Sequence, residues 1–442
     1  MMVRRSAESA ISEGMKSEFN LPDLPGIGVN HFGRLVARPP ERIPDDDDIL
    51  RALTNPVWGD QPDSPATVFD TVRPGESVCI VVSDQTRKTA ADLILPVLLA
   101  GLTARGCALT DMYILFACGI HRHPTGGEVE RILGATTATA FKGRIYMHDP
   151  DDDANLVSAG ITRLGHEVRL NRRAFETRRL ILTGTVTYHY HAGFGGGRKS
   201  LVPGLAGRQT IAHNHSLSLD LNVNRFHPHV HAGSLAGNPV AGEMLEGARM
   251  RAPDFIINTV LTPDNQLAGV FAGDLEAAHA AACRYAEGIY RCDISERADF
   301  VVASAEGSSN WIQAHKALYN ADLAVKQNGR IVLFAPCQEG LGNERFRHWV
   351  TRPTLDDLFD GLRKSPEVNG QTALSSRLRG AKTILVTSMG QKDRTDLGIE
   401  TAPDLESAIR KTVSDLVAAG IRKPVCYTMP EALFTVPFIA GA

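Results

Sequence analysis

The chain has 442 residues, and at roughly 150 residues per domain this length predicts two to three domains. Hydrophobic residues make up 43% and charged residues 22%, and the formal net charge is -3, so the basic excess of a nucleic-acid-binding protein is missing. No apolar run reaches the roughly 18 residues that predict a membrane span. We therefore expect neither nucleic acid nor a membrane as a partner.

The cysteines and the N-terminus predict a cytoplasmic location. The N-terminal residues are polar and lack the apolar stretch of a secretory signal. The seven cysteines are widely spaced and include no CxxC pair, which is typical of reduced thiols and not of a disulfide framework.

The first 70 residues show little periodicity, but they contain four consecutive aspartates, Asp45 to Asp48. Acidic side chains are favourable at the positive end of a helix dipole. These aspartates therefore predict the start of a helix rather than a metal site.

From residue 77 the chain alternates between short apolar runs and segments with helical spacing. Strands are expected over residues 77–83, 112–117, 143–149, 178–186 and 254–261. Helices are expected over residues 89–106, 128–134 and 275–290. Continuous apolar runs suit strands that are covered on both faces, so the alternation predicts a parallel α/β sheet.

A second alternating series follows. Its strands are expected over 298–305, 329–337, 382–389 and 423–429, and its helices around 311–320, 341–350 and 405–419. The chain is therefore expected to form two α/β domains, residues 1–294 and residues 295–429, each with a mostly parallel sheet flanked by helices. The apolar tail, residues 430–442, is expected to pack back on the first domain.

The most informative segment is the glycine-rich stretch that follows the strand over 178–186. It reads HYHAGFGGGRKSLVPGLAGRQTIAHNH and runs from His189 to His215. Ligands of open α/β sheets bind where strands end, and glycines allow the backbone to approach a ligand closely. Arg198 and Lys199 add two cations beside Gly196 and Gly197. Together with the flanking histidines, this loop predicts a ligand site.

Histidines are clustered in this chain. Four HxH pairs occur: His121/His123, His189/His191, His213/His215 and His229/His231. A neutral imidazole can bind a metal, and its pKa near neutrality suits acid–base catalysis. His227 extends the last pair into HPHVH, which fits either a metal patch or a polar loop.

Two further strand ends carry polar side chains. SDQTR follows the strand over 77–83 and contains Asp84, Thr86 and Arg87, while ACGIHR follows the next strand and contains His121. Arg87 can hold a carboxylate or a phosphate through two hydrogen bonds. Because three parallel strands deliver Asp84, His121 and His189 to one sheet edge, these side chains are expected to share a site.

In the second domain, NWIQAHKALYN places Gln313 and Lys316 three residues apart on one helix face. They can bind an anionic substrate in a cleft between the domains. A solvated helix face would show the same pattern.

Together these motifs resemble the nickel-pincer nucleotide-dependent lactate racemase family of 2-hydroxyacid racemases and epimerases. The match is HxxAGFxGGxK, then PGxAG, then a histidine sixteen residues after the lysine, which are here His189, Lys199, Pro203 and His215. AGDLEAAH, residues 272–279, also resembles the family.

The resemblance implies a cofactor and a set of roles. It implies nickel held in a pyridinium-3-thioamide-5-thiocarboxylic acid mononucleotide, which is linked to Lys199, with His215 as the protein ligand of the metal. It implies His121 and His189 as the catalytic acid and base. The remaining matches are cofactor-binding positions Asp84, Thr86, Gly196 and Gly197, and substrate-binding positions Arg87, Gln313 and Lys316.

The implied reaction inverts C2 of a 2-hydroxy acid by reversible hydride transfer, with the active site between the domains and with cofactor-making proteins as maturation partners. This sequence differs from the lactate racemase pattern at Cys118, Gly195 and Ile312. These differences leave the identity of the 2-hydroxy acid open and allow a substrate larger than lactate.

Two other functions remain open from the residues alone. A nicotinamide-dependent 2-hydroxyacid dehydrogenase would suit the α/β pattern, but no strand is followed by GxGxxG. A non-enzymatic histidine-rich metal-binding protein would account for the HxH pairs.

Overall fold

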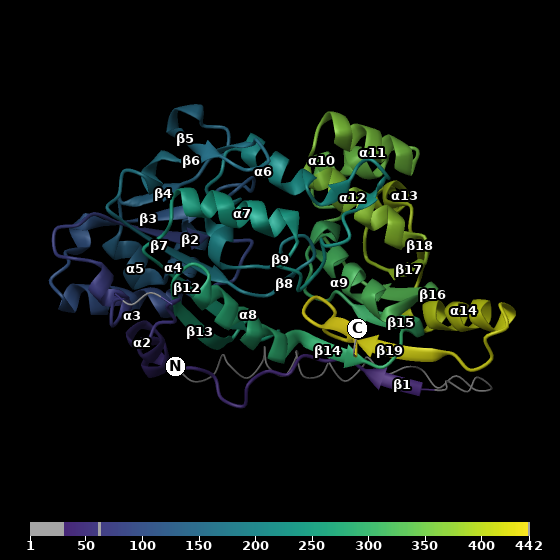
Figure 1. Ribbon diagram of the computed structural model, residues 1–442. Coiled ribbons are helices and arrows are strands. Elements are labelled where there is room, and N and C mark those ends of the chain that lie inside the picture. Colours follow the sequence, from purple (N-terminus) through teal and green to yellow (C-terminus); the bar gives the residue numbers. More distant parts are fainter. Residues whose placement is uncertain (1–30, 61–62, 441–442) are drawn as a thin grey trace. The chain divides into compact units, whose positions relative to one another are not determined.

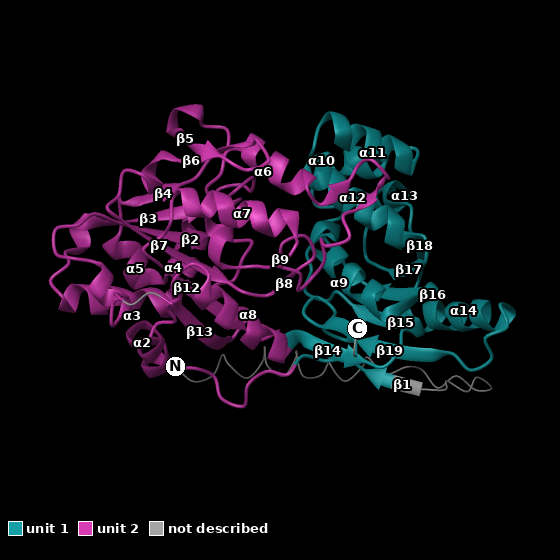
Figure 2. Cartoon of the chain, viewed as in Figure 1, with its two compact units in different colours: residues 1–37, 290–442 teal, residues 38–289 magenta. Residues whose placement is uncertain are grey.

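The computed structural model describes residues 31–60 and 63–440 and confirms the predicted α/β fold (Figure 1). The chain forms two compact units, each built around a six-stranded sheet (Figure 2). We call residues 38–289 the first unit (magenta, labelled unit 2 in Figure 2) and residues 290–440 together with residues 31–37 the second unit (teal, labelled unit 1). The second unit thus begins at Tyr290 and also includes a segment that precedes the first unit in the sequence.

The sheet of the first unit has the strand order β13-β12-β7-β2-β3-β4. Its strands are β2 (Val78–Ser83), β3 (Met112–Ala117), β4 (Ile145–Met147), β7 (Arg179–Thr185), β12 (Phe255–Leu261) and β13 (Leu267–Gly273). All neighbouring strands are parallel except β13, which is antiparallel to β12. The strands expected from the apolar runs are confirmed, whereas the antiparallel edge strand was not foreseen.

Helices bury the apolar faces of this sheet. They are α2 (Asp46–Thr54), α3 (Ala91–Ala104), α4 (Gly126–Leu133), α5 (Ala135–Ala140), α6 (Arg208–Ser216), α7 (Pro239–Met250) and α8 (Ala277–Tyr290). Leu53 of α2 and Leu98 of α3 pack in one core with Ile80 of β2. Burying each such side chain contributes roughly 1.5–3 kcal/mol, so this contact explains why these segments dock on the sheet.

The run of aspartates starts α2, as the sequence predicts. Asp45 is the residue before the helix, and its side chain accepts a hydrogen bond from the backbone N–H of Asp48. The Asp48 side chain accepts in return from the backbone N–H of Asp45, which completes a capping box.

This unit also contains three short pairs of antiparallel strands. They are β5 (Leu156–Ile161) with β6 (Glu167–Asn171), β8 (Tyr188–His189) with β9 (Gly193–Phe194), and β10 (Leu219–Asp220) with β11 (Arg225–Phe226). The β8–β9 pair shapes the start of the glycine-rich segment.

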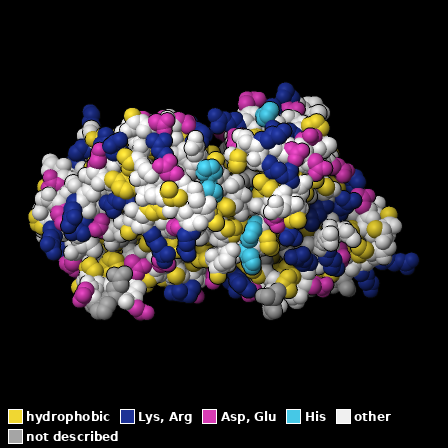
Figure 3. Space-filling model, turned by 45° about the horizontal axis from the view of Figure 1, so that its top comes forward, with side chains coloured by type: hydrophobic (Ala, Val, Ile, Leu, Met, Phe, Trp, Pro, Cys, Tyr) yellow, Lys and Arg dark blue, Asp and Glu magenta, His cyan; other side chains and the backbone are white. Residues whose placement is uncertain are grey.

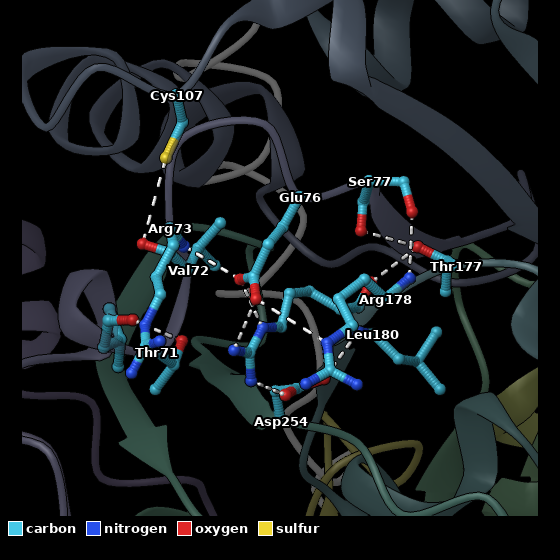
Figure 4. Close-up of polar contacts among 12 residues, drawn as sticks. Thr71, Val72, Arg73, Glu76, Ser77, Cys107, Thr177, Arg178, Leu180 and Asp254 are labelled. Atoms are coloured by element: carbon cyan, nitrogen blue, oxygen red, sulfur yellow. Dashed lines mark hydrogen bonds and ion pairs between the residues drawn. The ribbon is translucent and has the colours of Figure 1, made fainter.

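An ion cluster joins the first residues of three adjacent strands (Figure 4). The Arg179 guanidinium donates to both carboxylate oxygens of Glu76, at 2.6 and 2.9 Å, and to Asp254 at 2.8 Å. The hydrogen bonds from Arg179 lower the pKa of Glu76 to about 2. Because the three residues precede or begin β2, β7 and β12, the cluster holds these strands in register.

The sheet of the second unit has the order β1-β19-β15-β16-β17-β18 and is parallel throughout. Its strands are β1 (His31–Arg34), β15 (Ala298–Ser304), β16 (Val325–Phe334), β17 (Thr383–Val386), β18 (Glu400–Ala402) and β19 (Val425–Met429). Its helices are α9 (Trp311–Ala324), α10 (Glu344–Val350), α11 (Leu355–Lys364), α12 (Val368–Gly380), α13 (Gln391–Leu397) and α14 (Leu405–Ala418).

The C-terminal tail was expected to pack on the first predicted domain, residues 1–294, and it pairs with the end of that range, although both partners belong to the second compact unit. Its strand β20 (Val436–Ile439) pairs in parallel with β14 (Arg291–Ile294). The Asn320 side chain of α9 also donates to the carbonyl of Ala432 at 2.8 Å. These bonds satisfy backbone groups that an isolated apolar tail would leave exposed.

Candidate active site

The candidate site lies at the carboxyl edge of the first unit's sheet. Strands β7, β2 and β3 are adjacent and parallel, so the segments that follow them leave the sheet on the same edge. The chain proceeds from β2 to one side of the sheet and later returns to the other side with β7. Such a reversal of strand order is where ligands bind in open α/β sheets.

Asp84, which follows β2 directly, pairs with His121, which lies in the turn after β3. Asp84 Oδ2 is 2.7 Å from His121 Nδ1. The other oxygen, Oδ1, accepts hydrogen bonds from the backbone N–H and the hydroxyl of Thr86, at 2.9 and 2.6 Å. The carboxylate therefore receives the Nδ1–H of His121, which leaves the lone pair of the neutral ring on Nε2.

The environment of Asp84 favours its charged form. Burial by itself would raise the pKa of this carboxyl, because only 2% of the residue is exposed. The hydrogen bond and charge of His121, with the bonds from Thr86, outweigh burial and lower the pKa of Asp84 below its ordinary value. The His121 side chain is 42% exposed, so a buried carboxylate orients a solvent-accessible imidazole.

His189, on β8, is held in the opposite way. Its Nδ1 accepts hydrogen bonds from the backbone N–H groups of His191 and Ala192, both at 3.1 Å. A nitrogen that accepts two N–H groups cannot carry a proton itself, so the neutral ring carries its proton on Nε2. His121 and His189 are thus set in different tautomers by their hydrogen-bond partners.

His215, on α6, is buried and neutral. Its Nδ1–H donates to the carbonyl of Ile211 at 2.8 Å, so its lone pair is on Nε2. Burial, with the positive charge of Lys199, lowers the pKa of His215 to about 4, against the opposing effect of the Ile211 bond. An imidazole that is neutral and oriented through its second nitrogen is well suited to bind a metal.

Lys199 lies in a short 3₁₀ turn, Gly197–Ser200, that ends the glycine-rich loop. The loop is tightly enclosed. A Cβ on Gly196 would lie 2.6 Å from Val186 and 2.7 Å from Asn258, and Gly196 has a φ of +70°. Asn258 on β12 accepts a hydrogen bond from the backbone N–H of Gly197 at 2.8 Å. Glycine is therefore required here by both conformation and space.

Histidine rings connect these residues. The rings of His189 and His191 have centroids 6.2 Å apart, and those of His191 and His215 are 6.4 Å apart. His191 is 3% exposed, so it lies in the interior next to both candidate residues. The structure thus brings His189 and His215 into one cluster, to which the charge of Lys199 also extends.

The predicted substrate-binding residues belong to both units. The Arg87 guanidinium donates to the carbonyl of Thr86 at 3.0 Å, which places it beside the Asp84–His121 pair. In the second unit, Lys316 Nζ donates to Gln313 Oε1 at 2.9 Å on helix α9. Both side chains therefore share one face of this helix, as their spacing predicts.

The HPHVH segment shows no metal arrangement. Within residues 31–60 and 63–440, no three His, Cys, Asp or Glu side chains are grouped as a metal site. The rings of His227 and His229 are 5.8 Å apart, and His231 Nδ1 is 3.0 Å from the carbonyl of Ala232. Figure 3 shows that several histidine side chains reach the surface.

No helix in the described part of the chain has the length and apolarity of a membrane span.

Comparison with known proteins shows which family shares these features. Residues 28–225 match the model of the lactate racemase N-terminal domain, and residues 294–420 match that of the C-terminal domain. The lactate racemase of Lactiplantibacillus plantarum is 31% identical over 396 residues, which cover 86% of this chain and 90% of that protein. The lactate racemase of Thermoanaerobacterium thermosaccharolyticum is 29% identical over 339 residues, covering 76% of this chain and 75% of the relative.

Solved structures agree. The lactate racemase apoprotein from Thermoanaerobacterium thermosaccharolyticum superposes with a TM-score of 0.80 at 25% identity, covering 94% of this chain and 97% of that one. A protein from Thermotoga maritima shares the fold, with a TM-score of 0.66 at 18% identity and coverage of 90% and 100%. The α/β fold and these matches define an isomerase of the racemase class. The chain belongs to the lactate racemase family.

Asp84 and His121 were expected to share a site, and the structure pairs them directly. The role of Asp84 toward a cofactor stays a prediction. Three other residues of the site were not foreseen. His191, Asn258 and His279 were given no role, although all three contact the glycine-rich segment or its histidines. The only sequence signal for His279 is its place in AGDLEAAH. Asn258 lies in the middle of an apolar strand, where a buried polar residue is itself a signal.

Proposed function

We propose that this racemase inverts C2 of a 2-hydroxy acid, with a nickel-pincer nucleotide linked to Lys199. The proposal is carried by His215, a buried neutral imidazole with its lone pair on Nε2. The charge of Lys199 helps to lower the pKa of this imidazole. Lys199 supplies an amine for covalent attachment, and His215 supplies the metal ligand. Asp84, Thr86, Gly196 and Gly197 are the proposed contacts of the cofactor.

The residues of the chain fit such a group. Gly196 and Gly197 let the loop pack closely against Val186, Asn258 and His279, which fixes the backbone that leads to Lys199. The Nδ1–H bond from His215 to Ile211 fixes the ring, as second-shell bonds do for metal-binding histidines. When bound, the cofactor would supply the hydride acceptor that removal of the C2 hydrogen requires.

The chain itself supplies the proton chemistry. His121 accepts the substrate hydroxyl proton at Nε2, because Asp84 holds its Nδ1–H and stabilises the imidazolium that results. His189 is the proposed second acid–base group, and in its neutral form its Nε2–H can hydrogen-bond to the substrate oxygen. Transfer of a proton from His189 requires the imidazolium form, in which Nδ1 releases the two backbone N–H groups. The substrate oxygen can lie beside either imidazole, so the hydroxyl group can form again on either side of C2. The product is then either enantiomer.

Arg87, Gln313 and Lys316 are the proposed anchors of the substrate carboxylate. A fixed carboxylate lets the rest of the substrate turn while C2 stays in place. Cys118, Gly195 and Ile312 replace residues usual in lactate racemase, so we propose a 2-hydroxy acid substrate that can be larger than lactate.

Cofactor-making proteins are the expected maturation partners. The seven cysteines are buried thiols, which supports a cytoplasmic location.

The test is mass spectrometry of the chain produced together with the cofactor-making enzymes. We expect a mass increment on the Lys199 peptide, nickel by elemental analysis, and inversion or C2 deuterium loss across a panel of 2-hydroxy acids. A known lactate racemase made in the same cells is the control. If that control is modified and this chain is not, the cofactor assignment is wrong.

A further inference from the structure

The glycine-rich loop is built around the imidazole of His279. This residue lies near the start of α8 and is 4% exposed. Its Nε2 is 2.8 Å from the carbonyl oxygen of Gly195. A Cβ on Gly197 would lie 3.0 Å from the ring, so the imidazole occupies the space that a side chain would need.

Arg198 closes the same loop from the other side. Its guanidinium donates to the carbonyl of Ala192 at 3.2 Å and lies 3.3 Å from His279 Nδ1. A guanidinium only donates, so Nδ1 of His279 accepts and its Nε2–H donates to Gly195. His279 therefore binds the middle of the loop and, through Arg198, also its two ends.

The directions of these bonds do not change with pH in the ordinary range. Burial, followed by the charge of Arg198, lowers the pKa of His279 to about 3, so the ring stays neutral. Burial also lowers the pKa of Arg198 to about 10, which leaves the guanidinium charged at neutral pH.

Burial of the charged Arg198 side chain destabilises the core. Arg198 is 5% exposed, and among the described residues no carboxylate lies within ion-pair distance, although the charge of Glu276 acts on it from farther away. Burying a charge without a direct ion pair destabilises a core, whereas an apolar side chain of similar size would fill the space without that cost. A role beyond packing accounts for the cation.

The loop that these residues hold ends at the proposed attachment lysine. The Lys199 N–H donates to the carbonyl of Gly196 at 3.1 Å, so the backbone of Lys199 follows directly from the clamped segment. We propose that His279, acting through Gly195 and Arg198, is a positioning residue that presents Lys199 for covalent attachment. This inference rests on the proposed function of Lys199.

Two substitutions of His279 separate positioning from packing. In His279→Gln the amide nitrogen reaches the position of Nε2 and can still donate to Gly195, whereas in His279→Asn it reaches only the position of Nδ1. The two variants have the same amide chemistry and differ by one methylene group. Both are compared with the natural chain by thermal unfolding, to confirm that each folds.

Hydrogen exchange of backbone amides in the cofactor-free chain measures how readily the glycine-rich loop opens. In His279→Asn we expect the amides of Gly195, Gly197 and Lys199 to exchange at least about tenfold faster. Without the bond to Gly195, local opening of the loop requires less free energy. In His279→Gln we expect rates within about threefold of the natural chain. Peptides from β15 and β16 are the internal control and should not change.

The fraction of Lys199 modified after production with the cofactor-making enzymes gives the second readout. We expect a several-fold loss in His279→Asn and recovery in His279→Gln. Unchanged loop exchange in His279→Asn, or faster exchange throughout residues 38–289 in both variants, would overturn the positioning role. If Lys199 of the natural chain is never modified, the proposed cofactor fails, while the exchange comparison still decides whether His279 holds the loop.

Discussion

Asp84 Oδ2 lies 2.7 Å from Nδ1 of His121, so a carboxylate that is 2% exposed orients an imidazole whose side chain is 42% exposed. The two residues are 37 positions apart and come from the ends of adjacent strands. The pairing leaves the Nε2 lone pair of neutral His121 available to accept a proton, as its proposed role of general base requires.

Asp84→Asn should convert that base into a donor. The two hydrogen bonds from Thr86 need an acceptor, so they fix the amide oxygen and turn the amide nitrogen toward His121. His121 Nδ1 then accepts, and its proton moves to Nε2. We expect kcat of the cofactor-loaded enzyme to fall by about 10²–10⁴-fold.

Asp415→Asn is the matched control for that experiment. It makes the same change at a solvent-accessible carboxylate of α14 that pairs with Lys411, so its kcat should stay close to that of the natural enzyme. Both variants are checked for nickel content first. A kcat in Asp84→Asn within about tenfold of the natural value would mean that proton transfer to His121 does not limit the reaction.

The tautomers of the two histidines can be measured without the cofactor. Nitrogen-15 spectra of the histidine side chains should show a proton on Nδ1 of neutral His121 and on Nε2 of neutral His189, because their partners differ. Assignment uses His121→Asn and His189→Asn, each of which removes one set of signals. Finding both rings in the same tautomer would contradict the hydrogen bonds described above.

His215→Ala should remove the metal. We expect at least about tenfold less nickel per chain after production with the cofactor-making enzymes, since the only proposed protein ligand is lost. His229→Ala, in the HPHVH segment, is the comparison and should keep its nickel. The reverse pattern, with nickel lost only in His229→Ala, would favour the histidine-rich metal-binding alternative.

Glu76→Gln should destabilise the first unit in a pH-dependent way. The pKa of Glu76 is lowered to about 2 in the folded chain by the hydrogen bonds from Arg179, from an ordinary value of 4.5. Its stabilisation is therefore complete above the ordinary value and is lost as pH falls toward the folded value. We expect a loss of about 1–3 kcal/mol at pH 7.

Denaturant unfolding at several pH values measures this effect. The difference between the natural chain and Glu76→Gln should shrink steadily as pH falls below about 4.5. Glu406→Gln removes an exposed i,i+4 pair with Arg410 and should have no measurable effect. A difference that does not change with pH would show that packing, and not the ion cluster, accounts for the loss.

The fold could be predicted to a large extent because its signals are local. The apolar run over 77–83 corresponds to β2, and the run over 112–117 matches β3 residue for residue. Strand β13 was not predicted, because its sequence LAGVFAG contains two glycines and gives only a weak strand signal, and no local pattern encodes its antiparallel direction. The place of residues 31–37 depends on β1 pairing with β19 at the other end of the chain, which no local pattern encodes.

The sequence indicated which residues to expect in the candidate site, but it did not indicate the hydrogen bonds between them. Topology brought Asp84 and His121 to one edge, but which atom Asp84 would bind depends on side-chain geometry. The bond from His279 to Gly195 joins residues 84 positions apart. The histidine reads as one residue of an alanine-rich helix, so its role becomes visible only when α8 is seen beside the loop.

The different surroundings of His121 and His189 also constrain the kinetics. A racemase interconverts mirror images, so its equilibrium constant is one, and kcat/KM must be equal for the two enantiomers. A site with a carboxylate behind one imidazole and backbone N–H groups behind the other is not its own mirror image. Any difference in kcat between the enantiomers is therefore matched by the same ratio in KM, so that the enantiomer with the lower KM turns over proportionately more slowly.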